Sequence, residues 1–308
     1  MFLIIVNQIL KMLLLLLLGC LCYRMKLVDQ AGNKVLANLL LMVVNPCVAI
    51  TSLQTDYNAH LAQGLIAAYV LAFVIHLIAC ILSTILIRKT GNPNCGIDRF
   101  CAIYSNCGFI GIPLVQSILG SEGVLYLTAY MTVFNIFSWT HGVVVMNGSA
   151  SKEELKKGLL SPMIFACFLG LLLFFGRMRL SPTISDAMNY VAGMNTPLAM
   201  MIAGVAVAQT DLLGMLKNKR LYLISAGKLV IMPALTLVLL ALVRTHVDKT
   251  VAYTILVAAS CPVAASGTAF ALRFHKNYTY ASQLYALTTI GSLLTVPMFV
   301  YAAEQLLA

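Results

Sequence analysis

Charged residues are scarce in this sequence: Asp, Glu, Lys and Arg make up 10% of its 308 residues, against about 25% in a soluble globular protein. Apolar residues make up 61%, and the mean hydropathy is +0.93. This composition excludes a soluble domain and predicts an integral membrane protein whose surroundings are the lipid bilayer. The formal net charge of +10 does not indicate a nucleic-acid partner, because so apolar a chain has no water-facing surface on which to bind phosphates.

Acidic side chains are missing from the middle of every apolar segment. All ten lie in or beside the polar connections: Asp29, Asp56, Asp98, Glu122, Glu153, Glu154, Asp186, Asp211, Asp248 and Glu304. Proton relays in membrane pumps are usually built from carboxylates at the midplane, so this absence bears on energy coupling. The sequence also lacks His-Glu-x-x-His, Gly-x-Ser-x-Gly and paired aspartates. We therefore expect no enzyme activity, no metal and no cofactor.

The nine cysteines do not indicate a disulfide framework. Eight fall within apolar segments and only Cys95 lies in a polar loop, which is typical of small core residues in a reducing compartment. The N-terminus has no basic region before its apolar run and no small-residue cleavage site after it. We therefore expect a retained first helix rather than a signal peptide.

Ten apolar segments are long enough to span a bilayer, which takes about 20 residues each. They cover residues 2–23, 33–53, 61–87, 97–118, 121–146, 159–176, 183–209, 219–243, 250–272 and 277–303. Short loops rich in Lys and Arg stay cytoplasmic, and the alternate connections divide these residues 14 to 4. The count predicts ten spans in the cytoplasmic membrane of the cell, with both termini outside.

The interruptions of these segments recur five spans apart. Asn45-Pro46 in the second span corresponds to Asn195-Thr196-Pro197 in the seventh, and the run 105–113 in the fourth corresponds to the run 260–268 in the ninth. Because five is odd, the second unit enters the membrane upside down, which is the inverted repeat of secondary transporters. The predicted division is a first repeat, a cytoplasmic linker and a second repeat: 1–147, 148–158 and 159–308.

The two broken segments predict a binding site at the membrane midplane. Proline removes a helical hydrogen bond, and glycine lets the chain leave helical geometry. Backbone freed in this way cannot face lipid, so it is buried in protein or lines a wet cavity. The N-termini of half-helices carry partial positive charge and open N–H groups, which suits an anion such as a carboxylate.

The run Asn106-Cys107-Gly108-Phe109-Ile110-Gly111-Ile112-Pro113 resembles the auxin efflux carrier family, which includes bacterial malonate and malate permease-like proteins and plant auxin exporters. Asn45-Pro46 before it and the break 261–268 after it carry the same resemblance, which covers the whole chain. It implies an all-α membrane protein with ten helices in a 5+5 inverted repeat, similar in fold to the bile-acid sodium symporters. Helices 4 and 9 would cross, helices 1, 2, 6 and 7 would form a scaffold at a homodimer interface, and helices 3–5 and 8–10 would form the transport domain.

Two groups of residues are expected at this crossing. The helix-breaking group is Gly108, Gly111, Pro113, Pro262 and Gly267. The substrate-binding group is Asn45, Asn106, Asn135, Asn195, Ser260, Ser266 and Thr268. Asn135 enters this group as the counterpart of an Asn that lies near the substrate on helix 5 of the plant members.

Three titratable side chains deep in the predicted spans are candidates for a role in transport: Lys228, His76 and His141. Lys228 lies about nine residues into the eighth span, where a buried charge is by default a functional hypothesis. It is a substrate counter-charge, a fixed cation where sodium-coupled relatives hold an ion, or a Lys that reaches the interface or pairs with a helix C-terminal carbonyl. His76 and His141 titrate near neutrality and are candidates for proton transfer, although a lone His with a hydrogen-bonded partner is the commoner case.

These observations predict a secondary transporter that moves a small organic anion by alternating access, through uniport and in the direction of efflux. A proton- or sodium-coupled carboxylate symporter is one alternative. A membrane sensor that binds a ligand without moving it is the other.

Overall fold

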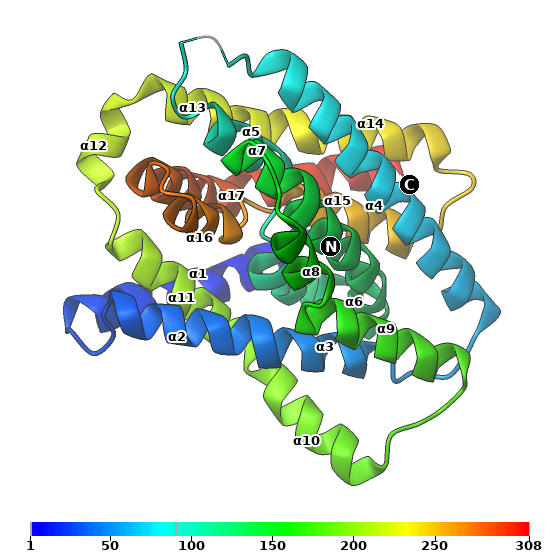
Figure 1. The fold of residues 1–308 in the computed structure, drawn as a ribbon. Helices are drawn as coiled ribbons and strands as arrows, with labels where there is room; N and C mark the ends of the chain where they lie inside the picture. The colour runs from blue at the N-terminus through cyan, green and yellow to red at the C-terminus, as the bar shows by residue number, and fades with distance from the viewer. Residues whose placement is uncertain (1, 90, 308) are drawn as a thin grey trace.

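Helices make up almost all of the structure, a computed structural model that describes residues 2–89 and 91–307 (Figure 1). The α-helices are α1 (Phe2–Arg24), α2 (Gln30–Leu39), α3 (Asn45–Ser52), α4 (Ala59–Leu86), α5 (Cys95–Ile103), α6 (Ile112–Phe137), α7 (Val143–Asn147), α8 (Lys152–Leu159), α9 (Pro162–Phe175), α10 (Pro182–Gly193), α11 (Asn195–Ala208), α12 (Leu212–Lys217), α13 (Lys219–Ala226), α14 (Met232–Val243), α15 (Lys249–Ser260), α16 (Ser266–Arg273) and α17 (Tyr278–Leu306). Five-residue π-helical segments join some of them: η1 (Leu40–Val44), η2 (Cys107–Gly111), η3 (Ser138–Gly142) and η4 (Gly227–Ile231). The prediction of an all-α protein is confirmed for the described part of the chain.

Within residues 2–89 and 91–307, seven helical stretches are long and apolar enough to cross a membrane. They are Ile4–Arg24, Gln30–Ser52, Ala59–Leu86, Cys107–Asn147, Pro182–Ala208, Lys219–Val243 and Tyr278–Leu306. The apolar helices α9 and α15 are shorter. The chain is therefore a multi-pass membrane protein, whereas the count of ten spans and the 5+5 repeat stay predictions. The expected boundary between the fourth and fifth spans lies inside α6, which is interrupted at Gly120 by a φ of +66°.

Wide helical turns accompany three of the prolines. Pro46, Pro113 and Pro233 each stand two residues after the end of a π-helical segment, η1, η2 and η4 respectively. Proline lacks an N–H and its ring clashes with the carbonyl one turn back, and a π-helical turn relieves that clash without ending the helix. The second span is therefore wound more loosely at Asn45-Pro46 and is not broken there, since Asn45 keeps helical angles of φ −62° and ψ −42°.

Helices α1 and α11 pack against each other at very short range. A Cβ atom added to Gly204 would collide with the carbonyl oxygen of Leu16, and one added to Gly19 would collide with that of Met201. The Cys20 thiol donates a hydrogen bond to the Gly204 carbonyl at 3.1 Å. Small residues at such positions let the backbones of membrane helices approach closely.

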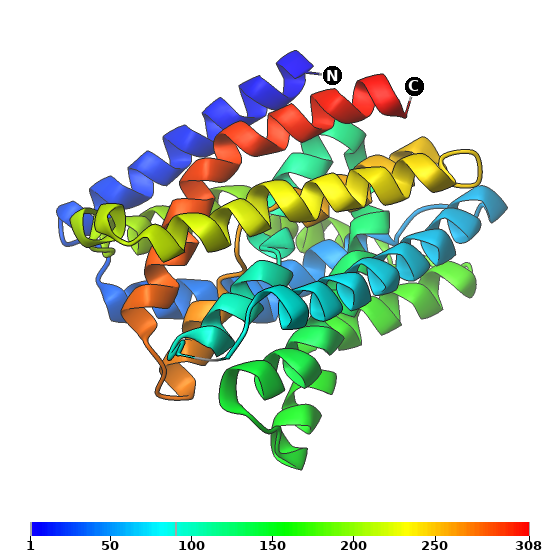
Figure 2. The ribbon, with the colours of Figure 1, turned by 90° about the horizontal axis from the view of Figure 1, so that it is seen from above.

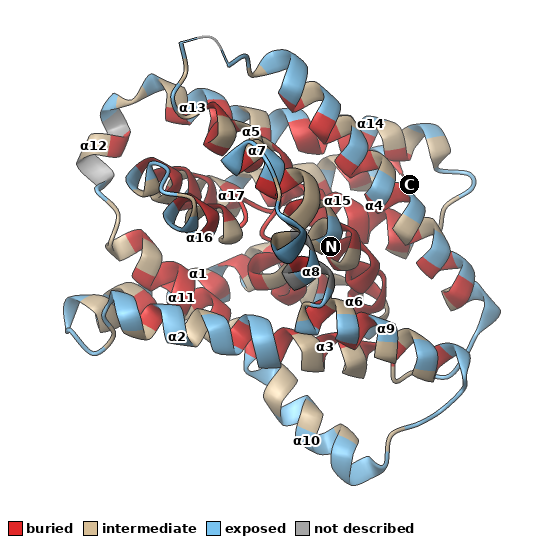
Figure 3. Ribbon diagram, viewed as in Figure 1, coloured by how far each residue is buried: buried red, intermediate tan, exposed pale blue. Residues whose placement is uncertain are grey.

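The buried residues lie around the centre of the bundle (Figure 3). Residues 251–260 of α15 are all buried, whereas none of the residues of α10 is buried. The N-terminal end of α1 and the C-terminal end of α17 lie near each other (Figure 2). The most exposed helix, α10, projects from one edge of the molecule in Figure 1.

Cys95 does not lie in a loop as expected. It is the first residue of α5, it is 6% exposed, and its thiol faces the Ile87 carbonyl at 3.7 Å. The turn through Asn92 and Asn94 ends the polar connection earlier than the composition indicates. All nine cysteines are free thiols, as the sequence predicts.

Candidate functional site

The structure brings the two interrupted segments together at one place. The chain leaves helical geometry between α5 and η2, and again between α15 and α16. The Asn106 N–H donates to the Pro262 carbonyl at 2.7 Å, and the Ala264 N–H donates to the Tyr104 carbonyl at 2.9 Å. These bonds form an antiparallel bridge between Ser105 and Val263. We call residues 104–106 and 261–265 the crossing.

Four helix ends meet at the crossing. The C-termini of α5 and α15 lead into it, and η2 and α16 begin from it. Helix C-termini carry partial negative charge and N-termini partial positive charge. The crossing therefore holds two sites suited to a cation and two suited to an anion.

Both N-terminal ends carry a polar side-chain atom that is buried without a partner in the described chain. Asn106 precedes η2 and is 5% exposed, and its Nδ2 makes no hydrogen bond to any described residue, although Tyr285 of α17 lies beside it. Ser266 begins α16, and its Oγ is likewise buried and unpaired among residues 2–89 and 91–307. A buried polar group without a partner costs about 1–3 kcal/mol, so such groups in a native protein call for a ligand, water or ion.

Asn45 and Asn195, the predicted counterparts in spans two and seven, are in direct contact. Both are 2% exposed, and Asn195 Nδ2 donates to Asn45 Oδ1 at 2.8 Å. The same Nδ2 lies 3.4 Å from the carbonyl oxygen of Gly108 in η2. A Cβ atom added to Gly108 would lie 3.0 Å from Asn45 Nδ2, so glycine permits this close approach. Side chains from two distant helices therefore meet the interrupted fourth span.

Lys228 occupies one of the two C-terminal ends. It is 1% exposed, and its Nζ donates to Ser105 Oγ at 2.5 Å and to the Ile103 carbonyl at 3.3 Å. The ammonium group thus lies at the negative end of the α5 dipole, where a positive charge is favourable. Of the expected roles, the structure matches pairing with a helix C-terminal carbonyl, and the same geometry suits a fixed cation.

The remaining predicted residues form two groups: polar side chains that bond to nearby backbone carbonyls, and glycines that permit close packing. Ser260, Thr268 and Asn135 donate to carbonyls of their own or the adjoining helical turn, those of Leu256, Ala265 and Met131. A Cβ atom on Gly111 would contact Cys261 across the crossing, and one on Gly267 would contact the Phe100 ring of α5. The substrate-binding role of Ser260, Thr268 and Asn135 stays a prediction.

The histidines lie beside the crossing on α4 and η3. The His76 Nδ1 lies 2.8 Å from the Ala72 carbonyl, and its Nε2 is buried without a partner among the described residues, with the Tyr130 ring 4.9 Å away between centroids. The His141 Nδ1 lies 3.0 Å from the hydroxyl of Tyr104. The same hydroxyl donates to the Phe137 carbonyl at 2.9 Å.

A cavity of about 10 Å³ lies next to the crossing. Its walls come from α1, η2, α6, α11 and α17: Ile9, Met12, Leu16, Ile110, Leu114, Met200, Thr289, Ser292 and Leu293. A space of this size holds at most one water molecule. The cavity as it stands is therefore too small for a carboxylate.

Two hydroxyl residues, one in the crossing and one that contacts it, were not identified from the sequence. Ser105 accepts the Lys228 hydrogen bond, and Thr288 of α17 accepts the Val263 N–H at 3.2 Å. Thr288-Thr289 is a pair of adjacent hydroxyl residues in the middle of a predicted span, which is the signal that could have identified it.

Comparison with known proteins agrees with these features. The family described as "Membrane transport protein" matches the chain twice, over residues 4–158 and 149–300. The chain belongs to this family. It is the auxin efflux carrier family that the Asn106–Pro113 run resembles. An uncharacterized transporter of Methanothermobacter thermautotrophicus is 23% identical over 307 residues, covering 95% of this chain and 96% of the relative. The function is therefore membrane transport, and transport rather than catalysis is the activity that the family indicates.

Proposed function

We propose that this membrane transport protein is a secondary carrier for small organic carboxylates that binds them at the crossing. The observation that carries the proposal is the pair of unpaired polar atoms, Asn106 Nδ2 and Ser266 Oγ, at the two N-terminal helix ends. Both can donate hydrogen bonds, and both lie where helix dipoles favour negative charge. A carboxylate has two oxygens and can accept a hydrogen bond on each of them.

Alternating access follows from which helices close the small cavity. We assign α1, α2, α3, α9, α10 and α11 to a scaffold, and the remaining spans to a transport domain that carries the crossing. Movement of one group relative to the other opens the space between them on alternate sides, as in carriers built from inverted repeats. In this scheme the chain crosses the cell membrane ten times with both termini outside, and the repeats are residues 1–147 and 159–308. The exposed helix α10 lies on the scaffold face that would meet a second copy.

Energy coupling follows from Lys228. Its ammonium already occupies the negative end of α5, so a sodium ion at the same place would meet like charge. No aspartate or glutamate is among the described residues that line the cavity or form the crossing. We therefore infer uniport, in which the membrane potential contributes about 2.3 kcal/mol per charge per 100 mV. An inside-negative potential then drives an anion outward.

Reconstituted protein tests this function. Proteoliposomes loaded with labelled malonate or malate are clamped at a chosen potential with potassium and valinomycin, without a pH or sodium gradient. We expect saturable flux that rises when the substrate-containing side is made negative. Saturable binding without flux would identify a sensor. Flux that ignores the potential and stops when a proton or sodium gradient is collapsed would identify a symporter, and loss of that flux in His76→Gln would implicate the histidine.

A further inference from the structure

The half-helix α5 is too short to hold its own position. It has nine residues, and its C-terminal end leads directly into the crossing at Tyr104. Isolated helices shorter than about 12–15 residues are marginal in water, and in proteins packing supplies most of their stability. The position of the crossing therefore depends on what holds α5.

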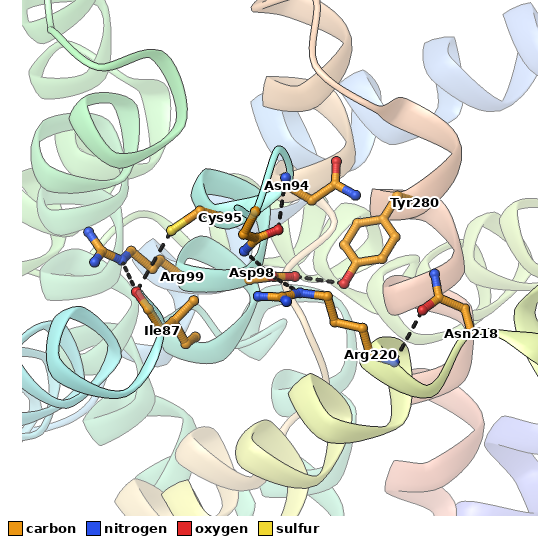
Figure 4. Close-up of polar contacts among 9 residues, drawn as sticks. Ile87, Asn94, Cys95, Asp98, Arg99, Asn218, Arg220 and Tyr280 are labelled. Carbon is orange, nitrogen blue, oxygen red and sulfur yellow. Dashed lines mark hydrogen bonds and ion pairs between the residues drawn. The ribbon is translucent and has the colours of Figure 1, made fainter. Parts of the chain in front are cut away.

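A buried carboxylate holds the N-terminal end of α5 (Figure 4). Asp98 is 0% exposed, and its Oδ2 accepts from Arg220 Nε of α13 at 2.6 Å and from Asn92 Nδ2 at 2.9 Å. Its Oδ1 accepts from the hydroxyl of Tyr280 in α17 at 2.7 Å. A buried carboxylate is costly unless it is paired and hydrogen-bonded, and here three donors from three segments satisfy it. Asp98 thus joins α5 to α13 and α17.

The C-terminal end of α5 is held from the same helix that supplies Arg220. Lys228 lies in η4, directly after α13, and donates to the Ile103 carbonyl and to Ser105. The eight steps along the helix from Arg220 to Lys228 give a rise of about 12 Å, which is close to the length of α5, about 13.5 Å. Two cations of one membrane helix therefore hold α5 at both ends.

A third connection fixes α5 to α4. Arg99 Nε donates to the Ile87 carbonyl at 2.8 Å (Figure 4). Its Nη2 donates to the Thr84 carbonyl at 3.1 Å. These carbonyls belong to the last turn of α4, where cationic side chains interact favourably with the helix dipole. The contacts at its two ends fix the position of α5 along its axis, and this contact with α4 also restricts its rotation.

We propose that Asp98, Arg220 and Tyr280 are positioning residues for transport. They set the position of α5 along its axis and its tilt, and so place the Asn106 amide at the crossing without touching the substrate. This inference rests on the proposed carboxylate site, but the arrangement of α5 that it describes is measurable without any substrate.

Tyr280→Phe tests the proposal with little risk to folding, because Arg220 and Asn92 still pair with Asp98. Tyr278→Phe is the matched control, since Tyr278 lies two residues before Tyr280 on the same helix and its hydroxyl accepts from Gln30 Nε2 at 3.5 Å on an exposed surface. We expect Tyr280→Phe to lower the melting temperature somewhat, because it removes one hydrogen bond to a buried carboxylate, but to stay folded at the assay temperature. Its binding of labelled malonate should be about threefold to tenfold weaker, because small misplacements of binding groups are costly. Tyr278→Phe keeps wild-type affinity.

The double variant Asp98→Asn/Arg220→Gln extends the test. It removes both charges, so no unpaired ion is buried, and we expect a melting temperature near that of the wild type with at least about tenfold weaker binding. Arg220→Gln alone leaves Asp98 buried without its cation and lowers the melting temperature. Wild-type affinity in both Tyr280→Phe and the folded double variant would overturn the positioning role.

Hydrogen exchange of residues 104–111 gives the readout that needs no substrate. We expect these amides to exchange about tenfold faster in Tyr280→Phe and in the double variant, with the exchange of α15 unchanged. Unchanged exchange at residues 104–111 would refute the positioning of α5 by Asp98, Arg220 and Tyr280, even if transport is lost. If the wild type neither binds nor moves a carboxylate, the proposed function fails, and the exchange result alone decides whether Asp98 positions the crossing.

Discussion

The hydrogen bond between Asn195 and Asn45 offers a quantitative test of the junction between the two halves of the chain. We consider Asn195→Leu, Asn45→Leu and the double variant, because leucine resembles asparagine in shape but cannot form hydrogen bonds. Each single change breaks this hydrogen bond at a site that is 2% exposed, although in Asn45→Leu the Asn195 amide keeps its 3.4 Å contact with the Gly108 carbonyl. The double change removes both polar groups.

The expected magnitude follows from the 2.8 Å contact. Leaving a buried partner unpaired costs about 1–3 kcal/mol in proteins generally, whereas hydrogen bonds between membrane helices couple by about 0.6 kcal/mol on average and about 1.7 at most. We therefore expect the double variant to be more stable than the sum of the single changes by about 0.6–1.7 kcal/mol. The Gly108 carbonyl, 3.4 Å from Asn195 Nδ2, makes Asn195→Leu the more harmful single change.

Unfolding in mixed detergent and SDS micelles measures these free energies. Asn135 supplies the control cycle, because its side-chain amide donates to the Met131 carbonyl of its own helix. Asn135→Leu combined with Asn195→Leu is expected to be additive within about 0.3–0.5 kcal/mol. If the Asn45 and Asn195 variants are additive to the same degree, the two side chains do not hold the halves together, and our account of the junction is wrong.

Two further predictions concern packing and topology. Gly204→Ala forces α1 away from α11 and is expected to lower the free energy of unfolding by about 1–3 kcal/mol. Gly227→Ala is the control, because its added carbon would lie in open space, and it is expected to leave the free energy of unfolding unchanged or raise it. Equal melting temperatures for the two variants would contradict the close packing of α1 and α11. In a cysteine-free background, an impermeant thiol reagent is expected to label Ser149→Cys only from the cytoplasmic side and Thr245→Cys only from outside, and labelling of both from one side would exclude the ten-span arrangement.

Much of the fold could be predicted because lipid leaves few choices. A span must satisfy its backbone internally, so long apolar segments become helices and polar residues mark their ends. The same constraint explains why the interruptions near Pro113 and Pro262 predict a crossing, since their freed backbone groups need partners. These partners are found in each other, through the bond between the Asn106 N–H and the Pro262 carbonyl.

The burial of Asp98 could not be predicted from its position in the sequence. It lies near a polar connection, as an exposed carboxylate would, and its partners Arg220 and Tyr280 are 122 and 182 residues away. Only the three-dimensional arrangement brings their donors to one carboxylate. Cys95 was placed in a loop for a related reason, because composition does not locate the turn at which α5 begins.

The site was predicted in part. The equal placement of Asn45 and Asn195 in the two halves indicated that they belong together, and their side chains meet. Sequence could not distinguish the polar residues with free atoms, Asn106 and Ser266, from Ser260, whose hydroxyl bonds to its own helix. That distinction depends on side-chain orientation, which no spacing rule supplies.

The dissociation constant of labelled malonate for Asn106→Ala and Ser266→Ala tests the central claim most directly. A hydrogen bond to a charged group is worth about 1.5–3 kcal/mol, so each variant should bind about 10- to 150-fold more weakly than the wild type. Ser117→Ala is the control, because its hydroxyl bonds to the Leu114 carbonyl of its own helix, and it should keep wild-type affinity. Unchanged affinity in both Asn106→Ala and Ser266→Ala, in protein that binds malonate, would contradict a carboxylate site at the crossing.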